Sequence, residues 1–257
     1  MARSAWEKLH DYRHGLPAII GKLRTLGFAQ YSEDVLLYQL NPQGEGFYID
    51  VGAFHPWQGS NTYKLYLRGW HGITIEPNPD AEPLFRKQRP RDTHLTIGIA
   101  HQRDTLTFHR FSDGRLNSFD PAQAQRMRAT PRGQIEVPCL PLSDVIEQHA
   151  NGRQVDLLSV DCEGLDLAVL TSLDLATTRP RVIVVEDFDQ FKQNNSPHGR
   201  SDIQAHLMAH DYVVVAQGLF SFLYVDAHAM THAGDTGFRL DQAQVTGLAY
   251  RPRAQAS

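Results

Sequence analysis

Acidic residues stand at the ends of four predicted strands, and their carboxylates are the groups in this chain best placed to do chemistry. The four endings read Asp50-Val51-Gly52-Ala53, Glu76-Pro77-Asn78-Pro79, Asp161-Cys162-Glu163-Gly164 and Glu186-Asp187. Burying a carboxylate without a partner costs roughly several kcal/mol, so acids at the ends of apolar strands need a partner or a ligand. In an open parallel sheet, ligands bind beyond the carboxyl ends of the strands. The four endings therefore predict one ligand-binding cleft.

The first two endings, which contain Asp50 and Glu76, fit a nucleoside. They flank one predicted βαβ unit, and an acid that closes the second strand can accept two hydrogen bonds from the hydroxyls of an adenosine ribose. Both NAD and S-adenosylmethionine contain that ribose. A pyrophosphate requires a glycine-rich turn, whereas this turn continues from Gly52 as Ala53-Phe54-His55-Pro56 and lacks the dinucleotide glycines. The turn therefore favours S-adenosylmethionine over a nicotinamide cofactor.

If S-adenosylmethionine donates a methyl group to a hydroxyl, the sequence offers two ways to remove the hydroxyl proton. Methyl transfer to a hydroxyl needs donor and acceptor oxygen in line, and the hydroxyl must lose its proton. In one route, Asp161 together with Glu186 and Asp187 offers the oxygen ligands that Mg²⁺ prefers. In the other, a histidine accepts the proton, and the candidates are His55 after the first strand and His198 after the fifth. The sequence leaves both routes open.

Composition narrows the class of partner. The chain has 257 residues, of which 41 % are hydrophobic and 21 % charged, as in ordinary globular domains. Its 25 Lys and Arg against 29 Asp and Glu give a formal charge of −4, so no basic excess points to nucleic acid or an anionic membrane. Cys139 and Cys162 are too few for a disulfide framework and are predicted to be buried thiols. No segment resembles a signal peptide or has the ~20 apolar residues that span a bilayer, so we expect a cytoplasmic protein.

Short apolar runs alternate with helix-period segments along the chain, which is typical of βαβ units. The predicted strands cover 46–51, 71–75, 93–99, 155–160 and 181–185. The predicted helices cover 62–68, 80–87, 142–149, 165–173 and 201–210. Two further strands, 212–216 and 220–225, are predicted to form a terminal antiparallel pair. This order predicts an α/β fold with a Rossmann-like, doubly wound, mostly parallel sheet.

A single core explains the pattern, because no repeat or low-complexity linker divides the chain. We assign residues 1–40 to an N-terminal helical extension and residues 41–257 to the main domain. An insert at about 103–140 contains two candidate strands, 105–108 and 134–137, around a polar stretch. The insert is predicted to form a hairpin or a lid.

Four segments of the chain together resemble the FkbM family of methyltransferases. They are Phe47 to Ala53, Ser60 to Tyr66, Gly69 to Pro79 and Ser159 to Gly164. Their order and spacing match the family from about Gln30 to Asp187, and the stretch Gly-Trp-His-Gly-Ile-Thr-Ile-Glu-Pro-Asn-Pro from Gly69 is highly specific. The resemblance implies a Rossmann-like sheet, S-adenosylmethionine as methyl donor, and transfer to a hydroxyl of a sugar or secondary metabolite.

The resemblance also implies roles for the strand-end residues. Asp50 and Gly52 match the family's cofactor turn, and Glu76 matches its ribose ligand. Asp161 and Glu163 match the family's Asp-x-Glu-Gly signature. These two acids have a second interpretation, in which they contact the cofactor's surroundings or cap the following helix.

Further candidate cofactor contacts lie in two loops. Gln30 begins a segment that looks like the family's Gln-x-Gly-Glu-Asp start, which closes over the cofactor, although Ser32 replaces the glycine here. Ser60 is predicted to cap the helix that follows it, while Asn61 and Thr62 can turn toward the cofactor.

We therefore predict a methyltransferase that uses S-adenosylmethionine to O-methylate a sugar, a glycan or a secondary metabolite. A catalytically silent methyltransferase-like binding module stays open, because retained Asp50, Gly52 and Glu76 speak for cofactor binding and not for turnover. A nicotinamide-dependent oxidoreductase is disfavoured by the missing glycines. The expected partner is a small-molecule or glycan hydroxyl acceptor, without nucleic acid or membrane, and a homo-oligomer is compatible with the sequence.

Overall fold

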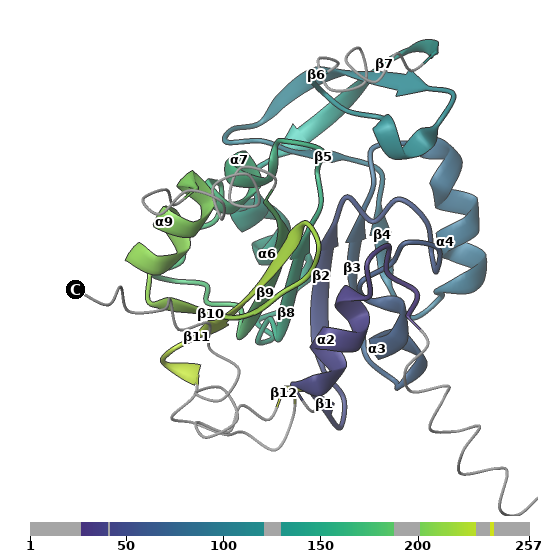
Figure 1. The fold of residues 1–257 in the computed structure, drawn as a ribbon. Helices are drawn as coiled ribbons and strands as arrows, with labels where there is room; N and C mark the ends of the chain where they lie inside the picture. Colours follow the sequence, from purple (N-terminus) through teal and green to yellow (C-terminus); the bar gives the residue numbers. More distant parts are fainter. Residues whose placement is uncertain (1–26, 41, 121–129, 188–200, 230–236, 239–257) are drawn as a thin grey trace, which may run out of the picture.

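A computed structural model describes residues 27–40, 42–120, 130–187, 201–229 and 237–238, and its centre is a seven-stranded sheet (Figure 1). In spatial order the strands are β10 (Tyr212–Gln217), β11 (Ser221–Asp226), β9 (Val182–Glu186), β8 (Leu157–Val160), β2 (Phe47–Val51), β3 (His71–Ile75) and β4 (Thr93–Leu95). The strands from β9 to β4 are parallel, and β11 and β10 are antiparallel to their neighbours. The chain order reverses between β8 and β2, and open α/β sheets bind ligands at such a switch point.

Helices cover both faces of the sheet because its strands are apolar on both sides. They are α2 (Glu33–Gln39), α3 (Tyr63–Leu67), α4 (Glu82–Gln88), α6 (Leu142–His149), α7 (Asp166–Thr171) and α9 (Asp202–Ala209), with short 3-10 turns η1 (Pro79–Ala81) and η2 (Gly114–Leu116). Ile49 of β2 packs in a core with apolar residues of α6, α7 and α9. Its neighbour Tyr48 packs in a second core with residues of α2 and α3. Successive strand residues point to opposite faces, so one strand serves both cores.

The predicted insert forms a small sheet of its own. Its strands are β5 (Gly98–Ile99), β7 (Pro131–Leu140) and β6 (Asp104–Phe111), of which β6 and β7 are antiparallel. The hairpin expected at about 103–140 is therefore present. Figure 1 shows the β6–β7 pair beyond one end of the main sheet.

The predicted strand 93–99 is wrong as one element, because it divides between the two sheets. Its first part, β4, pairs with β3, whereas β5 pairs with β7. A Cβ on Gly98 would lie 2.6 Å from both Phe119 and the Cys139 sulfur. Glycine at this position therefore allows the chain to cross tightly into the small sheet.

The other elements agree well with the sequence predictions. The segments 71–75 and 142–149 coincide with β3 and α6, and the terminal antiparallel pair is β10 with β11. A further short pair joins β1 (Pro42–Gln43) to β12 (Gly237–Phe238). Leu37 and Leu40 of the predicted extension pack in the second core, while residues 1–26 lie outside the described part. Within the described ranges, no helix has the length and apolar character needed to cross a membrane.

Candidate active site

A cavity of about 260 Å³ lies at the carboxyl ends of β2, β3 and β8, next to the switch point of the sheet. Its lining from the main sheet and the loops around it includes Gln30, Gly52, Phe54, Glu76, Asp161 and Glu163. The small sheet and its loops add Phe108, Gly114, Arg115, Asn117, Ser118 and Phe119. The cavity therefore has polar groups along the strand ends and an aromatic wall contributed by the insert.

The turn after β2 is closely fitted to the strand on its other side. Gly52 has a left-handed backbone with φ of 78°. The N–H groups of Gly52 and Ala53 both donate to the carbonyl of Ile75 at 3.0 Å. A Cβ on Gly52 would lie 1.8 Å from the carbonyl oxygen of Asp161. Only glycine fits here, because both its backbone conformation and the space beside it exclude a side chain.

Glu76 presents a fixed carboxylate to the cavity. Its Oε2 accepts a hydrogen bond from the N–H of Phe54 at 3.0 Å, and its Oε1 accepts one from the N–H of Asn78 at 2.8 Å. Burial raises the pKa of Glu76 to about 7, although these two N–H groups oppose the shift. Each carboxylate oxygen has a further lone pair, so the group can accept two more hydrogen bonds, as a vicinal diol requires.

Asp161 and Glu163 lie in the tight turn that follows β8. Glu163 has a left-handed backbone with φ of 52°, which is uncommon for a residue other than glycine and is found most often at functional sites. Burial, together with the negative charges of Asp166 and Glu163, raises the pKa of Asp161 well above the usual range of a carboxyl. This turn places a carboxyl with a high affinity for a proton at the cavity wall.

The segment before α2 closes another side of the cavity. Gln30 lines the cavity, and its Nε2 donates to the hydroxyl of Tyr31 at 2.9 Å. Ser32 adopts a left-handed backbone with φ of 68°. This conformation explains the glycine that the family resemblance implies at this position. Glu33 fixes the segment, because its carboxylate accepts bonds from the N–H of Tyr31 and from the hydroxyl of Ser221 at 2.9 and 3.0 Å.

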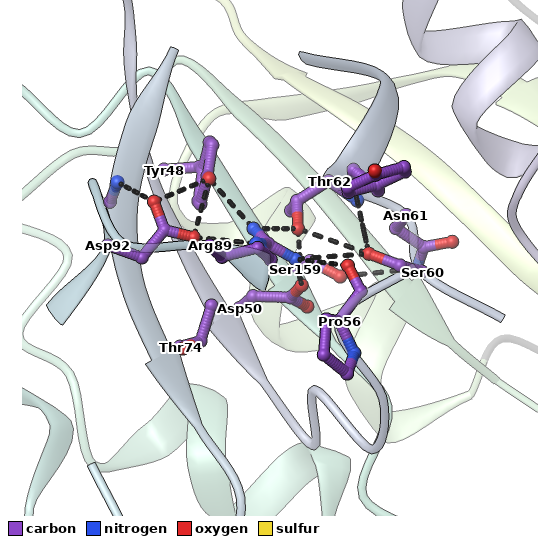
Figure 2. A network of polar contacts seen from close by, with 12 residues as sticks. Tyr48, Asp50, Pro56, Ser60, Asn61, Thr62, Thr74, Arg89, Asp92 and Ser159 are labelled. Carbon is purple, nitrogen blue, oxygen red and sulfur yellow. Dashed lines mark hydrogen bonds and ion pairs between the residues drawn. The ribbon is translucent and has the colours of Figure 1, made fainter. Parts of the chain in front are cut away.

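Three predicted cofactor contacts lie away from the cavity lining, in a buried polar network (Figure 2). Asp50 accepts a short hydrogen bond of 2.5 Å from the Thr62 hydroxyl, and Asn61 donates to Ser159 at 3.1 Å. Asp50 also lies 3.9 Å from a guanidinium nitrogen of Arg89. The structure therefore directs these three side chains to one another and to Arg89 and Ser159, and none of them lines the cavity.

The predicted metal set Asp161, Glu186 and Asp187 is not brought together. The carboxylate of Asp187 accepts a hydrogen bond from Ser201, which caps α9. Glu186 does not line the cavity; burial and the nearby Asp161 raise its pKa to about 10. Neighbouring residues at a strand end point to opposite faces, which separates the Glu186–Asp187 pair. Across the described ranges, no group of three His, Cys, Asp or Glu residues is arranged to hold a metal ion.

Of the two predicted histidine bases the structure describes only His55, which does not line the cavity. His55 lies in the loop after β2, and its Nδ1 accepts hydrogen bonds from the N–H groups of Trp57 and Gln58 at 3.4 and 3.1 Å. His55 is not among the cavity-lining residues, so it shapes its loop. His198 lies outside the described residues.

Two features of this site, an aromatic wall and a buried arginine, are not predicted from the sequence. The first is the aromatic wall, in which the rings of Phe108 and Phe119 lie 4.9 Å apart. The second is Arg89, whose guanidinium is buried beneath the cavity-lining loop. The two phenylalanines give no local signal that they face a cavity. Arg89 stands in the charged run from Arg86 to Asp92, where nothing in the sequence distinguishes this buried arginine from its exposed neighbours.

Comparison with known proteins identifies the family. The family model described as the methyltransferase FkbM domain matches residues 50–215. A search of curated proteins gave no match. Among solved structures, an O-methyltransferase from Bacillus cereus in complex with SAH is 11 % identical, with a TM-score of 0.40, over 82 % of this chain and 89 % of that chain. The family match spans the cofactor turn, Glu76 and the signature after β8, and the chain therefore belongs to the FkbM family of methyltransferases.

Proposed function

We propose that this protein transfers a methyl group from S-adenosylmethionine to a hydroxyl of a sugar, a glycan or a secondary metabolite. The observation that carries the proposal is Glu76, whose carboxylate is fixed by two backbone N–H groups and lines the cavity beside the Gly52 turn. This arrangement suits the two hydroxyls of an adenosine ribose. The aromatic and aliphatic side chains of the cavity wall suit the adenine ring.

Asp161 is the residue best placed to take the proton from the acceptor. S-adenosylmethionine, when bound, supplies an electrophilic methyl group on a sulfonium sulfur. Asp161 lines the cavity, and its raised pKa makes its ionised form a stronger base than an ordinary aspartate, so the reaction needs the molecules in which Asp161 is ionised. With S-adenosylmethionine bound, the ionised Asp161 carboxylate would accept the proton of an acceptor hydroxyl whose oxygen takes the methyl group, and S-adenosylhomocysteine would be the leaving group.

The cofactor is tested by thermal unfolding in the presence of S-adenosylhomocysteine or NAD. A ligand at about 100 times its dissociation constant stabilises a protein by roughly 2.7 kcal/mol, which is measurable as a rise in Tm. We expect S-adenosylhomocysteine to raise Tm and NAD to leave it unchanged. Stabilisation by NAD alone would contradict the proposal.

Turnover is tested with labelled methyl donor and a panel of sugars, glycans and metabolite hydroxyls, with and without a chelator. Label in a hydroxyl-bearing acceptor, unaffected by the chelator, is the expected result. Cofactor binding without transfer to any acceptor would favour the silent binding module instead.

The Asp161→Asn variant is expected to lose about 10²–10⁴-fold in turnover, because an amide cannot accept the hydroxyl proton. The measurement is the rate of methyl transfer at saturating donor and acceptor. Binding of S-adenosylhomocysteine should persist and serves as the control for an intact cavity. Turnover equal to that of the unaltered protein would remove Asp161 from the proposed reaction.

Cofactor affinity is expected to rise as pH rises through about 7, where Glu76 ionises. The ionised carboxylate accepts hydrogen bonds from the ribose hydroxyls more strongly than the neutral acid does. The stability of the protein without cofactor changes in the opposite direction. Because folding raises the pKa of Glu76, this group's contribution to the free energy of unfolding falls as pH rises from about 4.5 to about 7.

The measurement is the Kd for S-adenosylhomocysteine between about pH 6 and pH 8, in the unaltered protein and in Glu76→Gln. The variant should bind about tenfold or more weakly at the upper pH and show a flatter pH profile, since its side chain stays neutral. The exposed Glu82 on α4 does not line the cavity, so Glu82→Gln is a matched control with an unchanged profile. A steep profile that persists in Glu76→Gln would show that another group titrates.

A further inference from the structure

Arg89, which follows the last residue of α4, has a guanidinium that connects three separate segments. Its side chain is fully buried. The Nε donates to Asp92 at 2.6 Å, and Nη2 donates to the hydroxyls of Tyr48 and Thr62 at 2.7 and 2.9 Å. Figure 2 shows this guanidinium at the centre of the polar network, between β2 and the loop that follows it.

The remaining guanidinium nitrogen holds the loop itself. Nη1 donates to the carbonyl of Pro56 at 3.3 Å and to the hydroxyl of Ser60 at 3.4 Å. These two residues flank Gln58 and Gly59, which line the cavity. Arg89 thus binds the loop on both sides of its cavity-lining residues, although it does not line the cavity itself.

The loop in turn supports the segment before α2. Gly59 forms a parallel β-bridge with Ala29, and both Ala29 and Gln30 line the cavity. A shift of the loop would therefore move two parts of the cavity wall at once.

We propose that Arg89 is a positioning residue for the cofactor cavity: it holds the Pro56–Ser60 loop, and through that loop the Ala29–Gln30 segment, in the binding geometry. This inference rests on the proposed function, because it assumes that S-adenosylmethionine and its product bind in the cavity. Asp50 and Thr62 help to fix the guanidinium, since the Thr62 hydroxyl accepts a hydrogen bond from Arg89 and donates one to Asp50.

The geometry requires arginine and not merely a positive charge. A guanidinium is planar and donates in several fixed directions, whereas a lysine ammonium is a single point with three donors on a flexible stem. Lysine at position 89 can keep an ion pair with Asp92, but it cannot also reach Pro56, Ser60, Thr62 and the hydroxyl of Tyr48. The loop should therefore lose its anchor in Arg89→Lys while the buried charge is retained.

The test is the Kd for S-adenosylhomocysteine, measured by calorimetry below the unfolding midpoint of every variant. Arg89→Lys is expected to bind at least about tenfold more weakly than the unaltered protein. Thr62→Val, which keeps the side-chain volume but loses the hydroxyl, is expected to show a smaller loss. Hydrogen exchange of the amides in 57–60 should become faster in Arg89→Lys.

Arg179 provides a matched control, because it lies before the amino end of β9, whereas the cavity lies at the carboxyl ends of the parallel strands. Its guanidinium also bonds to a carboxylate, that of Asp226 at 2.7 Å, and to two carbonyls, those of His210 and Leu175 at 2.7 and 3.1 Å. Arg179→Lys therefore also replaces a guanidinium that bonds to a carboxylate and to backbone carbonyls, although at a site that is 23 % exposed and away from the cavity. Arg179→Lys should leave the Kd and the loop's hydrogen exchange unchanged.

The outcomes separate this inference from the proposed function. If the unaltered protein does not bind S-adenosylhomocysteine, the proposed function fails. If it binds and Arg89→Lys binds equally well, or if Arg179→Lys loses as much affinity, the positioning role is refuted. If Arg89→Lys does not fold, Thr62→Val decides, and unaltered affinity in that variant refutes the role.

Discussion

Replacement of Arg89 by methionine is expected to lower the free energy of unfolding by about 3–5 kcal/mol, because removing one partner of a buried ion pair leaves the other charge uncompensated. Arg89→Met leaves the carboxylates of Asp92 and Asp50 without the cation that lies 2.6 and 3.9 Å from them. Methionine fills much of the same volume, so lost packing contributes little. Urea denaturation monitored by circular dichroism measures the effect.

Arg86→Met is the matched control for this prediction, since Arg86 lies on α4, the helix that Arg89 directly follows. Arg86 also pairs with an acid, Glu82, but its side chain is 79 % exposed. An exposed pair of this kind contributes less than about 1 kcal/mol. Equal destabilisation by the two variants would show that burial of the Arg89 network is not what stabilises the fold.

The Gly52→Ala variant is expected to bind S-adenosylhomocysteine about 100-fold more weakly, because overpacking costs about 1–3 kcal/mol and about 2.7 kcal/mol corresponds to 100-fold in Kd. The added methyl group would lie 1.8 Å from the backbone oxygen of Asp161. Backbone cannot rotate away as a flexible side chain does, so the turn or the segment after β8 must move. Both line the cavity. Calorimetric titration of the folded variant measures the loss.

Gly152→Ala separates the clash from the backbone conformation. Gly152 has φ of 71°, close to the 78° of Gly52, but a Cβ there would meet no heavy atom within 4 Å. It lies in the turn after α6 and does not line the cavity. This variant should lose some stability and keep its affinity. A comparable loss of binding in both variants would contradict the argument from close contact.

The sequence predicts this fold well wherever a local pattern determines the structure. The segments 71–75 and 142–149 coincide with β3 and α6, because a short continuous apolar run in a strand and an apolar stripe on a helix are local properties. The placement of Gly52 and Glu76 at the cavity is predictable for the same reason, since a glycine turn and an acid at a strand end are recognisable in the sequence. Residues in such positions are predictable without knowledge of their neighbours.

The features that the sequence does not predict depend on contacts between distant segments. The side chain of Asp50 turns to Thr62 and Arg89, a choice made by residues of a helix and a loop that its own strand does not determine. The split of 93–99 between two sheets depends on how Gly98 meets Phe119 and Cys139. Sequence patterns report burial and period, but not which partner a side chain will find.

The aromatic wall of the cavity has a consequence for how new specificities arise. That wall belongs to the β5–β7–β6 sheet, which is a separate hydrogen-bonded unit, while Gly52 and Glu76 belong to the main sheet. Substitutions in the insert can thus reshape one side of the cavity and leave the seven-stranded scaffold and the Glu76 carboxylate intact. For protein engineering, libraries confined to the loop between β6 and β7 are the natural way to change what this side of the cavity binds without loss of the fold.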